Sequence, residues 1–445
     1  MFGTSGIRGP VGSTVTAELA LEVGRALASD GYERVVLGRD VRDSGKVLGT
    51  TLAAGARECG SDVIDLGVAA TPTVARSVGW FDADAGVVIT ASHNPSTDNG
   101  IKLWTPSGKA FGPDQREAIA SRIEREDYTL ADWDGHGTQR STDDGNRLHL
   151  DALQESVSLE TPLDVVVDLG NGAGRVTADV LTALGCRVRT INGHPDGAFP
   201  GRPSEPNEET LEDLQVMVGS TDADLGIAHD GDADRMVAVD ETGTFVPKDV
   251  LLALFARDAA GEGDRVAAPV DTSLSVDDAL ADVGATLTKT RVGDVYVAER
   301  ATEPDVVFGG EPSGAWIWPE ETLCPDGPLA ACRLVELVAD AGPMSALVDS
   351  VDTYPIRRDS LEVADNTAVM ATITDRVTER YDDEDVDTLD GVRVDCGDGW
   401  FLLRASGTQP LVRVTAEART AERADALERE AMAILEDAIS ASVEG

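Results

Sequence analysis

The chain has 445 residues, of which 42% are hydrophobic, so it can bury sizeable cores and is not disordered as a whole. Asp and Glu number 81 against 37 Lys and Arg, a formal net charge of −44, which argues against nucleic acid or acidic membranes as partners. Five scattered cysteines without C-x-x-C spacing, no signal or transit peptide, and no apolar run of roughly 20 residues predict a soluble cytoplasmic protein without disulfides or zinc.

The N-terminal part of the sequence alternates β-like runs with a helical stretch. The β-like runs cover 35–40, 62–66 and 85–89, and a helical pattern covers 44–59 between the first two. The third run leads directly into a polar loop at 90–95, Thr-Ala-Ser-His-Asn-Pro. This order predicts one α/β unit with a loop at the end of its third strand.

The same order of elements returns twice. The second copy has its strand, helix, strand, strand and loop at 164–168, 176–184, 187–191, 224–228 and 229–235. The third copy has them at 265–270, 275–283, 286–290, 305–308 and 309–314. Three copies predict three related strand-helix-strand-strand α/β domains with mixed sheets, and loops at the carboxyl ends of strands are expected to face a shared cleft.

The C-terminal part departs from this plan. Strand-like and helical runs at 356–363, 366–381, 391–396, 400–404, 411–418 and 421–440 predict a smaller α+β domain. Turn-rich segments at 126–147, 240–243 and 341–343 mark the breaks between domains. The predicted domains are therefore 1–135, 148–241, 242–342 and 350–445.

Three aspartates, Asp230, Asp232 and Asp234, alternate with small residues after a predicted strand. Three carboxylates that converge there would repel one another without a cation, and such oxygen ligands select Mg²⁺, Mn²⁺ or Ca²⁺. An EF-hand is excluded because its sixth position, which requires glycine, holds Arg235. A metal site is favoured over a solvated acidic turn.

Two further loops carry residues suited to phosphate chemistry. Ser92, beside His93, is either a nucleophile or phosphate carrier or simply a turn residue, and the absence of Gly-x-Ser-x-Gly argues against an α/β-hydrolase. The second loop contains Arg404, Ser406, Gly407 and Thr408. It offers a guanidinium, two hydroxyls and the backbone amides around the glycine, a set that favours a phosphate-binding loop over a plain glycine turn. Arg8, in the opening glycine-rich segment, also offers a cation to an anion.

Taken together, these segments resemble the α-D-phosphohexomutase superfamily over essentially the whole chain. The matching segments are 90–95 (phosphoserine loop), 230–235 (metal loop), 311–314 (sugar-binding loop) and 404–410 (phosphate-binding loop). The resemblance implies four domains around a central cleft, with Ser92 carrying the transferred phosphoryl group. It also implies one Mg²⁺ per chain, held by Asp230, Asp232, Asp234 and the phosphate on Ser92, and activation by a sugar bisphosphate.

The resemblance assigns roles to the remaining candidates. The residues expected to bind substrate or offset its charge are Arg235, Glu311, Ser313, Arg404, Ser406, Gly407 and Thr408. Lys102 and His93 match positions tied to acid–base work, and Lys102 is the expected general base, provided that the cleft lowers its pKa. Arg8 is expected to help order the site.

The resemblance specifies the identity of the sugar less firmly than the phosphoryl-transfer reaction. The segments around Trp316 and Arg404 are most similar to archaeal phosphoglucosamine mutases, which implies conversion of glucosamine 6-phosphate to glucosamine 1-phosphate. Phosphoglucomutase/phosphomannomutase activity is the alternative, and a non-catalytic sugar-phosphate-binding protein is a remote one. Two departures from the superfamily pattern, Ala315 for histidine and Gln409 for glutamate, bear on sugar selection and local charge. The sequence leaves monomer and homo-oligomer open.

The acidic residues are spread along the whole chain rather than clustered in a tail. This distribution favours a halophilic protein, because a Debye length of about 3 Å at 1 M salt removes most of the self-repulsion.

Overall fold

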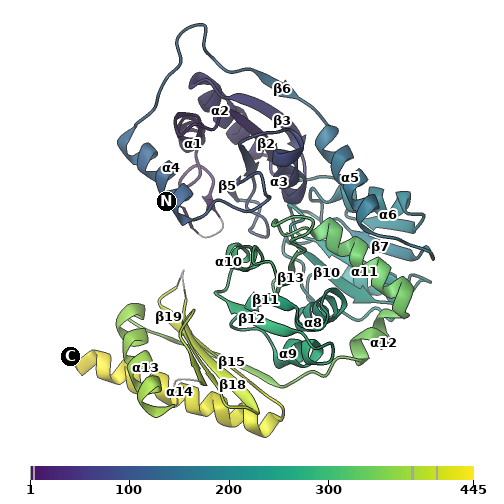
Figure 1. The fold of residues 1–445 in the computed structure, drawn as a ribbon, viewed down its shortest axis with the longest axis vertical. Helices are drawn as coiled ribbons and strands as arrows, with labels where there is room; N and C mark the ends of the chain where they lie inside the picture. The colour runs from purple at the N-terminus through teal and green to yellow at the C-terminus, as the bar shows by residue number, and fades with distance from the viewer. Residues whose placement is uncertain (1, 4–5, 382–384, 407–408, 445) are drawn as a thin grey trace.

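A computed structural model describes residues 2–3, 6–381, 385–406 and 409–444 (Figure 1). Four α/β units follow one another along a curved row, with the first (purple) and the last (yellow) at its two ends. They are called domains I to IV after the four sheets that they contain. No helix among the described residues combines the length and the apolar character needed to span a membrane.

The sheet of domain I has the order β1-β5-β4-β2-β3-β6. These strands are β1 (Ile7–Pro10), β2 (Arg34–Arg39), β3 (Asp62–Val68), β4 (Ala85–Ile89), β5 (Asp98–Trp104) and β6 (Gln139–Ser141). The helices are α1 (Ala17–Ser29), α2 (Gly45–Glu58), α3 (Thr71–Trp80) and α4 (Pro113–Arg125), and α5 (Asp144–Ser156) leads to domain II. Strands β2, β3 and β4 are parallel and β5 is antiparallel to β4. Strand β6 lies within a segment that the sequence pattern indicates only as a linker.

Domains II and III repeat this arrangement. Domain II contains β7 (Asp164–Asp168), α6 (Arg175–Ala183), β8 (Arg187–Ile191), α7 (Glu212–Gly219), β9 (Leu225–His229) and β10 (Met236–Asp240). Domain III contains α8 (Lys248–Ala259), β11 (Arg265–Pro269), α9 (Leu274–Ala281), β12 (Thr286–Thr290), α10 (Asp294–Arg300), β13 (Val306–Glu311), β14 (Ala315–Ile317), α11 (Gly327–Ala341) and α12 (Met344–Asp349).

The three repeats share one strand order. The neighbours run β3-β2-β4-β5, β8-β7-β9-β10 and β12-β11-β13-β14, with three parallel strands and a fourth, antiparallel one. In each repeat the third strand and the antiparallel fourth are joined by a polar loop, and these loops carry Ser92, the three aspartates and the segment after Glu311. The predicted internal repeat is confirmed, because the loops occupy equivalent positions at strand ends.

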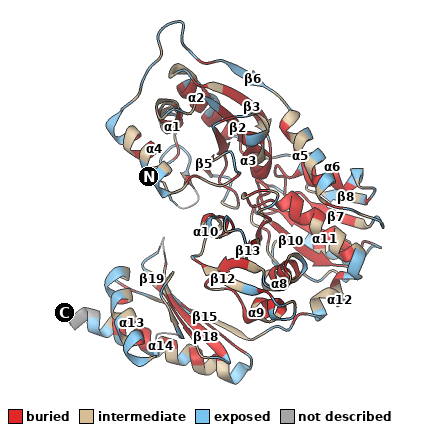
Figure 2. Cartoon of the chain, viewed as in Figure 1, coloured by how far each residue is buried: buried red, intermediate tan, exposed pale blue. Residues whose placement is uncertain are grey.

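Domains II and III share one hydrophobic core. It joins Val165 of β7 and Ile227 of β9 to Phe255 of α8, Phe308 of β13 and Leu334 of α11, all fully buried or nearly so. Figure 2 shows this buried material as continuous red through α8, α11 and the strands beside them. Domain I packs its apolar residues on both faces of its own sheet, and domain IV has a separate core.

Domain IV is the predicted smaller α+β unit. Its antiparallel sheet has the order β15-β19-β18-β17-β16, with β15 (Ile356–Glu362), β16 (Val386–Asp387), β17 (Val392–Asp395), β18 (Gly399–Ala405) and β19 (Leu411–Ala418). Two helices pack on this sheet, α13 (Asn366–Arg380) and α14 (Ala421–Glu444). The phosphate-binding candidates lie between β18 and β19.

Candidate active site

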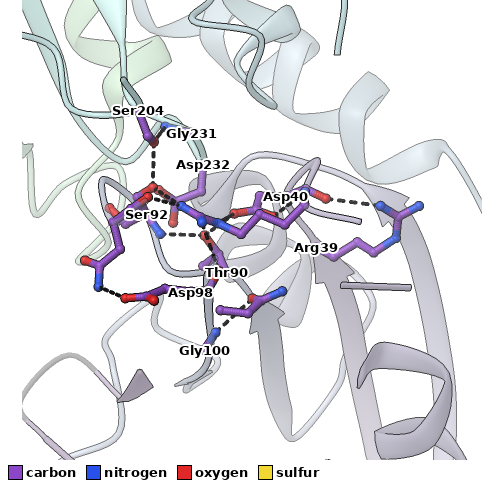
Figure 3. A network of polar contacts seen from close by, with 12 residues as sticks. Arg39, Asp40, Thr90, Ser92, Asp98, Gly100, Ser204, Gly231 and Asp232 are labelled. Carbon is purple, nitrogen blue, oxygen red and sulfur yellow. Dashed lines mark hydrogen bonds and ion pairs between the residues drawn. The ribbon is translucent and has the colours of Figure 1, made fainter. Parts of the chain in front are cut away.

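Ser92 lies in the loop between β4 and β5 and is 1% exposed. Its φ of +52° places a non-glycine residue in the left-handed region, a conformation that the surrounding contacts must hold. The Ser92 amide donates to Thr90 Oγ1 at 2.8 Å, and the Ser92 carbonyl accepts from Arg42 and from Ser204 Oγ (Figure 3). The serine therefore has a fixed backbone from which its hydroxyl projects.

Arg42 supports this loop from inside domain I. Its guanidinium donates to the carbonyl oxygens of three loop residues, Ser92, Asn94 and Pro95, and of Asp98, the first residue of β5. Asp40 holds Arg42 through a fully buried ion pair at 2.9 Å and accepts from Thr90 Oγ1 at 2.7 Å. Burial raises the pKa of Asp40 to about 6, although Arg42 opposes the shift. Both charges are thus desolvated to shape the serine loop.

The three aspartates form a compact cluster in the loop between β9 and β10. Oxygens of Asp230, Asp232 and Asp234 lie within 4.8 Å of one another, and all three residues are buried. Burial, followed by repulsion from Asp234 and Asp232, raises the pKa of Asp230 well above its usual value. Asp232 Oδ1 is buried and has no hydrogen-bond partner among the described residues. An unsatisfied oxygen in an all-carboxylate set fits a hard divalent cation.

The serine hydroxyl meets this cluster directly. Ser92 Oγ donates to Asp230 Oδ2 at 2.6 Å and lies 3.4 Å from Asp234 Oδ1. Asp232 is held from the side by Thr71, whose hydroxyl donates to its carboxylate at 2.6 Å. The sequence places Ser92 and Asp230 138 positions apart, and the fold brings them into hydrogen-bond contact.

Lys102, on β5, balances part of the acidic charge. Its Nζ lies 2.5 Å from Asp234 Oδ2 and 3.4 Å from Asp232 Oδ2. Burial alone would lower the pKa of Lys102, but these two carboxylates outweigh burial and raise the pKa. The lowered pKa on which the general-base role of Lys102 depends is therefore not met in this structure, in which Lys102 is a paired cation.

His93 and Arg8 lie beside the cluster. His93 Nδ1 is 3.4 Å from Ser92 Oγ. Burial and the cations Arg235, Arg8 and Lys102 lower the pKa of His93 to about 3, so its imidazole is neutral. Arg8, on β1, has a buried Nε without a hydrogen-bond partner among the described residues. His93 thus lies beside the Ser92 hydroxyl, and Lys102 lies beside the aspartates that this hydroxyl contacts.

The predicted sugar-binding loop adjoins the predicted metal loop. Glu311 ends β13, and Ser313 Oγ donates to its Oε2 at 3.1 Å. The Met236 amide donates to the Gly314 carbonyl at 2.9 Å, which ties this loop to the residue after Arg235. Burial, with the nearby charge of Asp294, raises the pKa of Glu311 to about 7. Arg235 reaches Glu205 at 3.8 Å.

The phosphate-binding candidates are described in part. Arg404, at the end of β18, makes an ion pair with Asp390 at 3.0 Å. Ser406 is 7% exposed, and its Oγ accepts from the Gln409 amide at 3.3 Å. Gly407 and Thr408 lie outside the described residues.

Several residues that build the site are missing from the sequence prediction. Asp40 and Arg42 directly follow β2, so their position at a strand end was a usable signal. Ser204 and Asp390 lie in irregular segments with no motif, and Asp294 opens a short helix. Their roles come from contacts between distant parts of the chain, which no local pattern encodes.

Profiles of one family match the chain in order. They are described as phosphoglucomutase/phosphomannomutase α/β/α domains I, II and III and the C-terminal domain, over residues 1–130, 147–243, 247–354 and 357–434.

Individual proteins agree with these profiles. The chain is 45% identical over 446 residues to a Methanothermobacter thermautotrophicus protein named "Probable phosphoglucosamine mutase", covering 99% of this chain and 98% of that one. It is 45% identical over 438 residues to a Methanopyrus kandleri protein of the same name, covering 96% of each. A solved phosphoglucomutase/phosphomannomutase family protein from Burkholderia thailandensis superposes with a TM-score of 0.88 at 29% identity, covering 98% of both chains. The chain therefore belongs to the phosphoglucomutase/phosphomannomutase family.

Proposed function

We propose that this protein is a phosphoglucosamine mutase that interconverts glucosamine 6-phosphate and glucosamine 1-phosphate. The observation that carries the chemistry is the hydrogen bond from Ser92 Oγ to Asp230 within the carboxylate cluster. The sugar is supported by relatives at 45% identity over nearly the whole chain that bear this name.

In the proposed reaction Ser92 carries a phosphoryl group. A free hydroxyl of the bound sugar monophosphate attacks the phosphorus, the bond to Ser92 Oγ breaks, and a sugar bisphosphate forms. This intermediate then returns its other phosphoryl group to Ser92, which completes the net transfer between the two ends of the sugar. Over the first step the attacking hydroxyl loses a proton and Ser92 Oγ gains one, and His93 Nδ1, 3.4 Å from Ser92 Oγ, is within reach of the proton that arrives there.

The chain's own charges suit the transferring group. Phosphoserine carries about −1.5 to −2 charge near pH 7, and the cations Arg235, Arg8 and Lys102 all act electrostatically at this site. Mg²⁺ would be held by Asp230, Asp232, Asp234 and the phosphate on Ser92, where it would neutralise charge on the phosphoryl oxygens. Glu311 and Ser313 would bind the sugar, and Arg404, Ser406, Gly407 and Thr408 its phosphate. A sugar bisphosphate would act as activator by supplying the first phosphoryl group.

Turnover of three sugar phosphates tests the proposal. Glucosamine 6-phosphate, glucose 1-phosphate and mannose 1-phosphate are compared by kcat/KM with Mg²⁺ and a trace of sugar bisphosphate, for the wild type and Ser92→Ala. Ser96→Ala, an exposed serine of the same loop, is the matched control. Preference for glucosamine 6-phosphate and loss of turnover only in Ser92→Ala support the proposal.

Other outcomes assign the protein differently. A preference for glucose or mannose phosphate would retain the mechanism and make the protein a phosphoglucomutase/phosphomannomutase. Binding of sugar phosphate without turnover by phosphorylated protein would contradict the enzymatic proposal and indicate a sugar-phosphate-binding protein.

A further inference from the structure

A turn in domain III connects the sugar-binding and phosphate-binding loops. Val292 and Gly293, between β12 and α10, present consecutive backbone amides to two different carboxylates. The Gly293 amide donates to Glu311 Oε1 at 2.6 Å, and the Val292 amide donates to Asp390 Oδ2 of domain IV at 3.0 Å. Adjacent peptide groups therefore contact the sugar-binding carboxylate and the neighbouring domain.

Asp390 carries this connection to the phosphate-binding loop. The same oxygen that accepts from Val292 also lies 3.0 Å from a terminal nitrogen of Arg404. The next residue, Gly391, has a φ of +88°, and a Cβ there would lie 2.4 Å from the Leu403 carbonyl oxygen. The close approach that glycine allows places Asp390 beside Arg404.

A second bond reinforces the contact between the two domains. Arg291 Nε donates to the Leu389 carbonyl at 3.1 Å. Consecutive residues of domain III, Arg291 and Val292, thus bind consecutive residues of domain IV, Leu389 and Asp390. Glu311 and Arg404 belong to sheets with separate cores, so their spacing depends on the docking of domain III against domain IV.

This spacing has a consequence for binding. A ligand with a sugar ring at one end and a phosphate at the other gains from both loops only if the loops are held at matching separation. Inorganic phosphate needs the Arg404 loop alone. A guanidinium has five N–H donors, so Arg404 can retain Asp390 at one nitrogen and still bind a phosphate.

We propose that Asp390 is a positioning residue that, through the Val292 amide, sets the distance between Glu311 and Arg404 and so selects hexose monophosphates over phosphate alone. This inference deepens the proposed function and rests on its assignment of Arg404 to the substrate phosphate. It predicts that loss of Asp390 lowers the affinity for a hexose monophosphate, which contacts both loops, and leaves the affinity for inorganic phosphate nearly unchanged.

Calorimetric binding of two ligands tests this role. Glucosamine 6-phosphate and inorganic phosphate are titrated into unphosphorylated wild type, Asp390→Ala and Asp390→Asn. Asp390→Ala is expected to weaken glucosamine 6-phosphate about tenfold or more and leave inorganic phosphate within about threefold. Asp390→Asn, which keeps an acceptor for Val292, is expected to lie between. Asp398→Ala, which removes an ion pair with Arg423 inside domain IV and leaves the Val292–Asp390 contact in place, is the matched control with an unchanged ratio.

A second variant keeps the test decisive if Asp390→Ala does not fold. Arg291→Ala removes the bond to Leu389 that lies next to the Val292–Asp390 contact, without touching Asp390 or Arg404, and it should lower the same affinity ratio. Equal weakening of both ligands, or an unchanged ratio in both variants, would overturn the inference. If the wild type binds both ligands but turns over no hexose phosphate, the mutase proposal fails while the affinity ratio still tests Asp390.

Discussion

Ser204 Oγ donates a 2.7 Å hydrogen bond to the carbonyl oxygen of Ser92, which joins an irregular segment of domain II to the serine loop of domain I. The same hydroxyl accepts from the Gly231 amide at 3.1 Å, inside the aspartate loop. One side chain therefore fixes the serine loop relative to the metal loop, as Figure 3 shows.

Removal of this hydroxyl should reduce activity more than stability. We expect Ser204→Ala to lower kcat about tenfold, because a small misplacement of Ser92 is costly for catalysis, while unfolding free energy falls by about 1 to 2 kcal/mol. Steady-state kinetics and thermal unfolding measure the two effects. Ser220→Ala, at the end of α7, is the control; full activity of Ser204→Ala would refute the coupling.

Arg42 should be needed for both folding and activity. Arg42→Met leaves Asp40 buried without its partner, which we expect to cost about 3 to 5 kcal/mol of stability. The double variant Arg42→Met, Asp40→Asn removes the unpaired charge and should recover much of that stability. It should remain poorly active, because the carbonyls of the Ser92 loop still lack their donor. Turnover measures the activity of each variant, and chemical denaturation measures its stability. Full activity in the double variant would show that the loop holds its shape without Arg42.

Binding of a divalent cation should stabilise the protein. The clustered carboxylates of Asp230, Asp232 and Asp234 repel one another, so Mg²⁺ should raise the unfolding temperature, and the rise should continue with the logarithm of its concentration above the dissociation constant. Asp232→Asn should abolish this rise, whereas Asp134→Asn, at an exposed site, should keep it. Differential scanning calorimetry with EDTA and with Mg²⁺ measures the effect. An identical rise in both variants would place the cation elsewhere.

Binding of the sugar should depend on the ionisation of Glu311, whose pKa is raised to about 7 by burial and by Asp294. Protonation removes an acceptor for sugar hydroxyls, so affinity should fall as the pH drops through about 7. Asp294→Asn removes one cause of the shift and should move this midpoint to lower pH. Titrations of glucosamine 6-phosphate across the pH range compare the two proteins, and the ligand's own titration is common to both. Coincident profiles would contradict the assignment.

The ionisation of Glu311 should also make the stability of the folded protein depend on pH. Because the folded pKa of Glu311 is raised above 4.5, folding favours its protonated form. Its stabilising effect is complete below the unfolded pKa and is lost as pH rises through about 7.

Salt should stabilise the chain, as the net charge of −44 predicts. The Debye length falls from about 10 Å at 0.1 M to about 3 Å at 1 M salt, which screens most of the self-repulsion. We expect the unfolding temperature to rise between these concentrations of KCl. A flat or falling dependence, measured against an equal osmolality of an uncharged solute, would argue against halophilic adaptation.

The site residues that the sequence predicts are those whose role can be recognised from their neighbours in the sequence. Ser92, the three aspartates and Glu311 stand at ends of hydrophobic strands, where polar residues indicate a ligand. Ser204 acts on Ser92 across 112 positions, and no periodicity reports such a contact. The pKa of Lys102 could not be predicted for the same reason. The direction of its shift depends on Asp232 and Asp234, which lie 130 and 132 positions away in the sequence. Strand β6 was missed because its three exposed residues lack an apolar pattern.

The core shared by domains II and III changes how the chain can be divided. Phe255, on the helix that follows domain II, contacts Phe308, Trp316 and Trp318, and the same core continues into β7 and β9. A cut between the second and third repeats would expose this apolar surface on both fragments. The second and third repeats thus form one unit, and we expect a fragment of domain II alone to aggregate unless domain III is expressed with it.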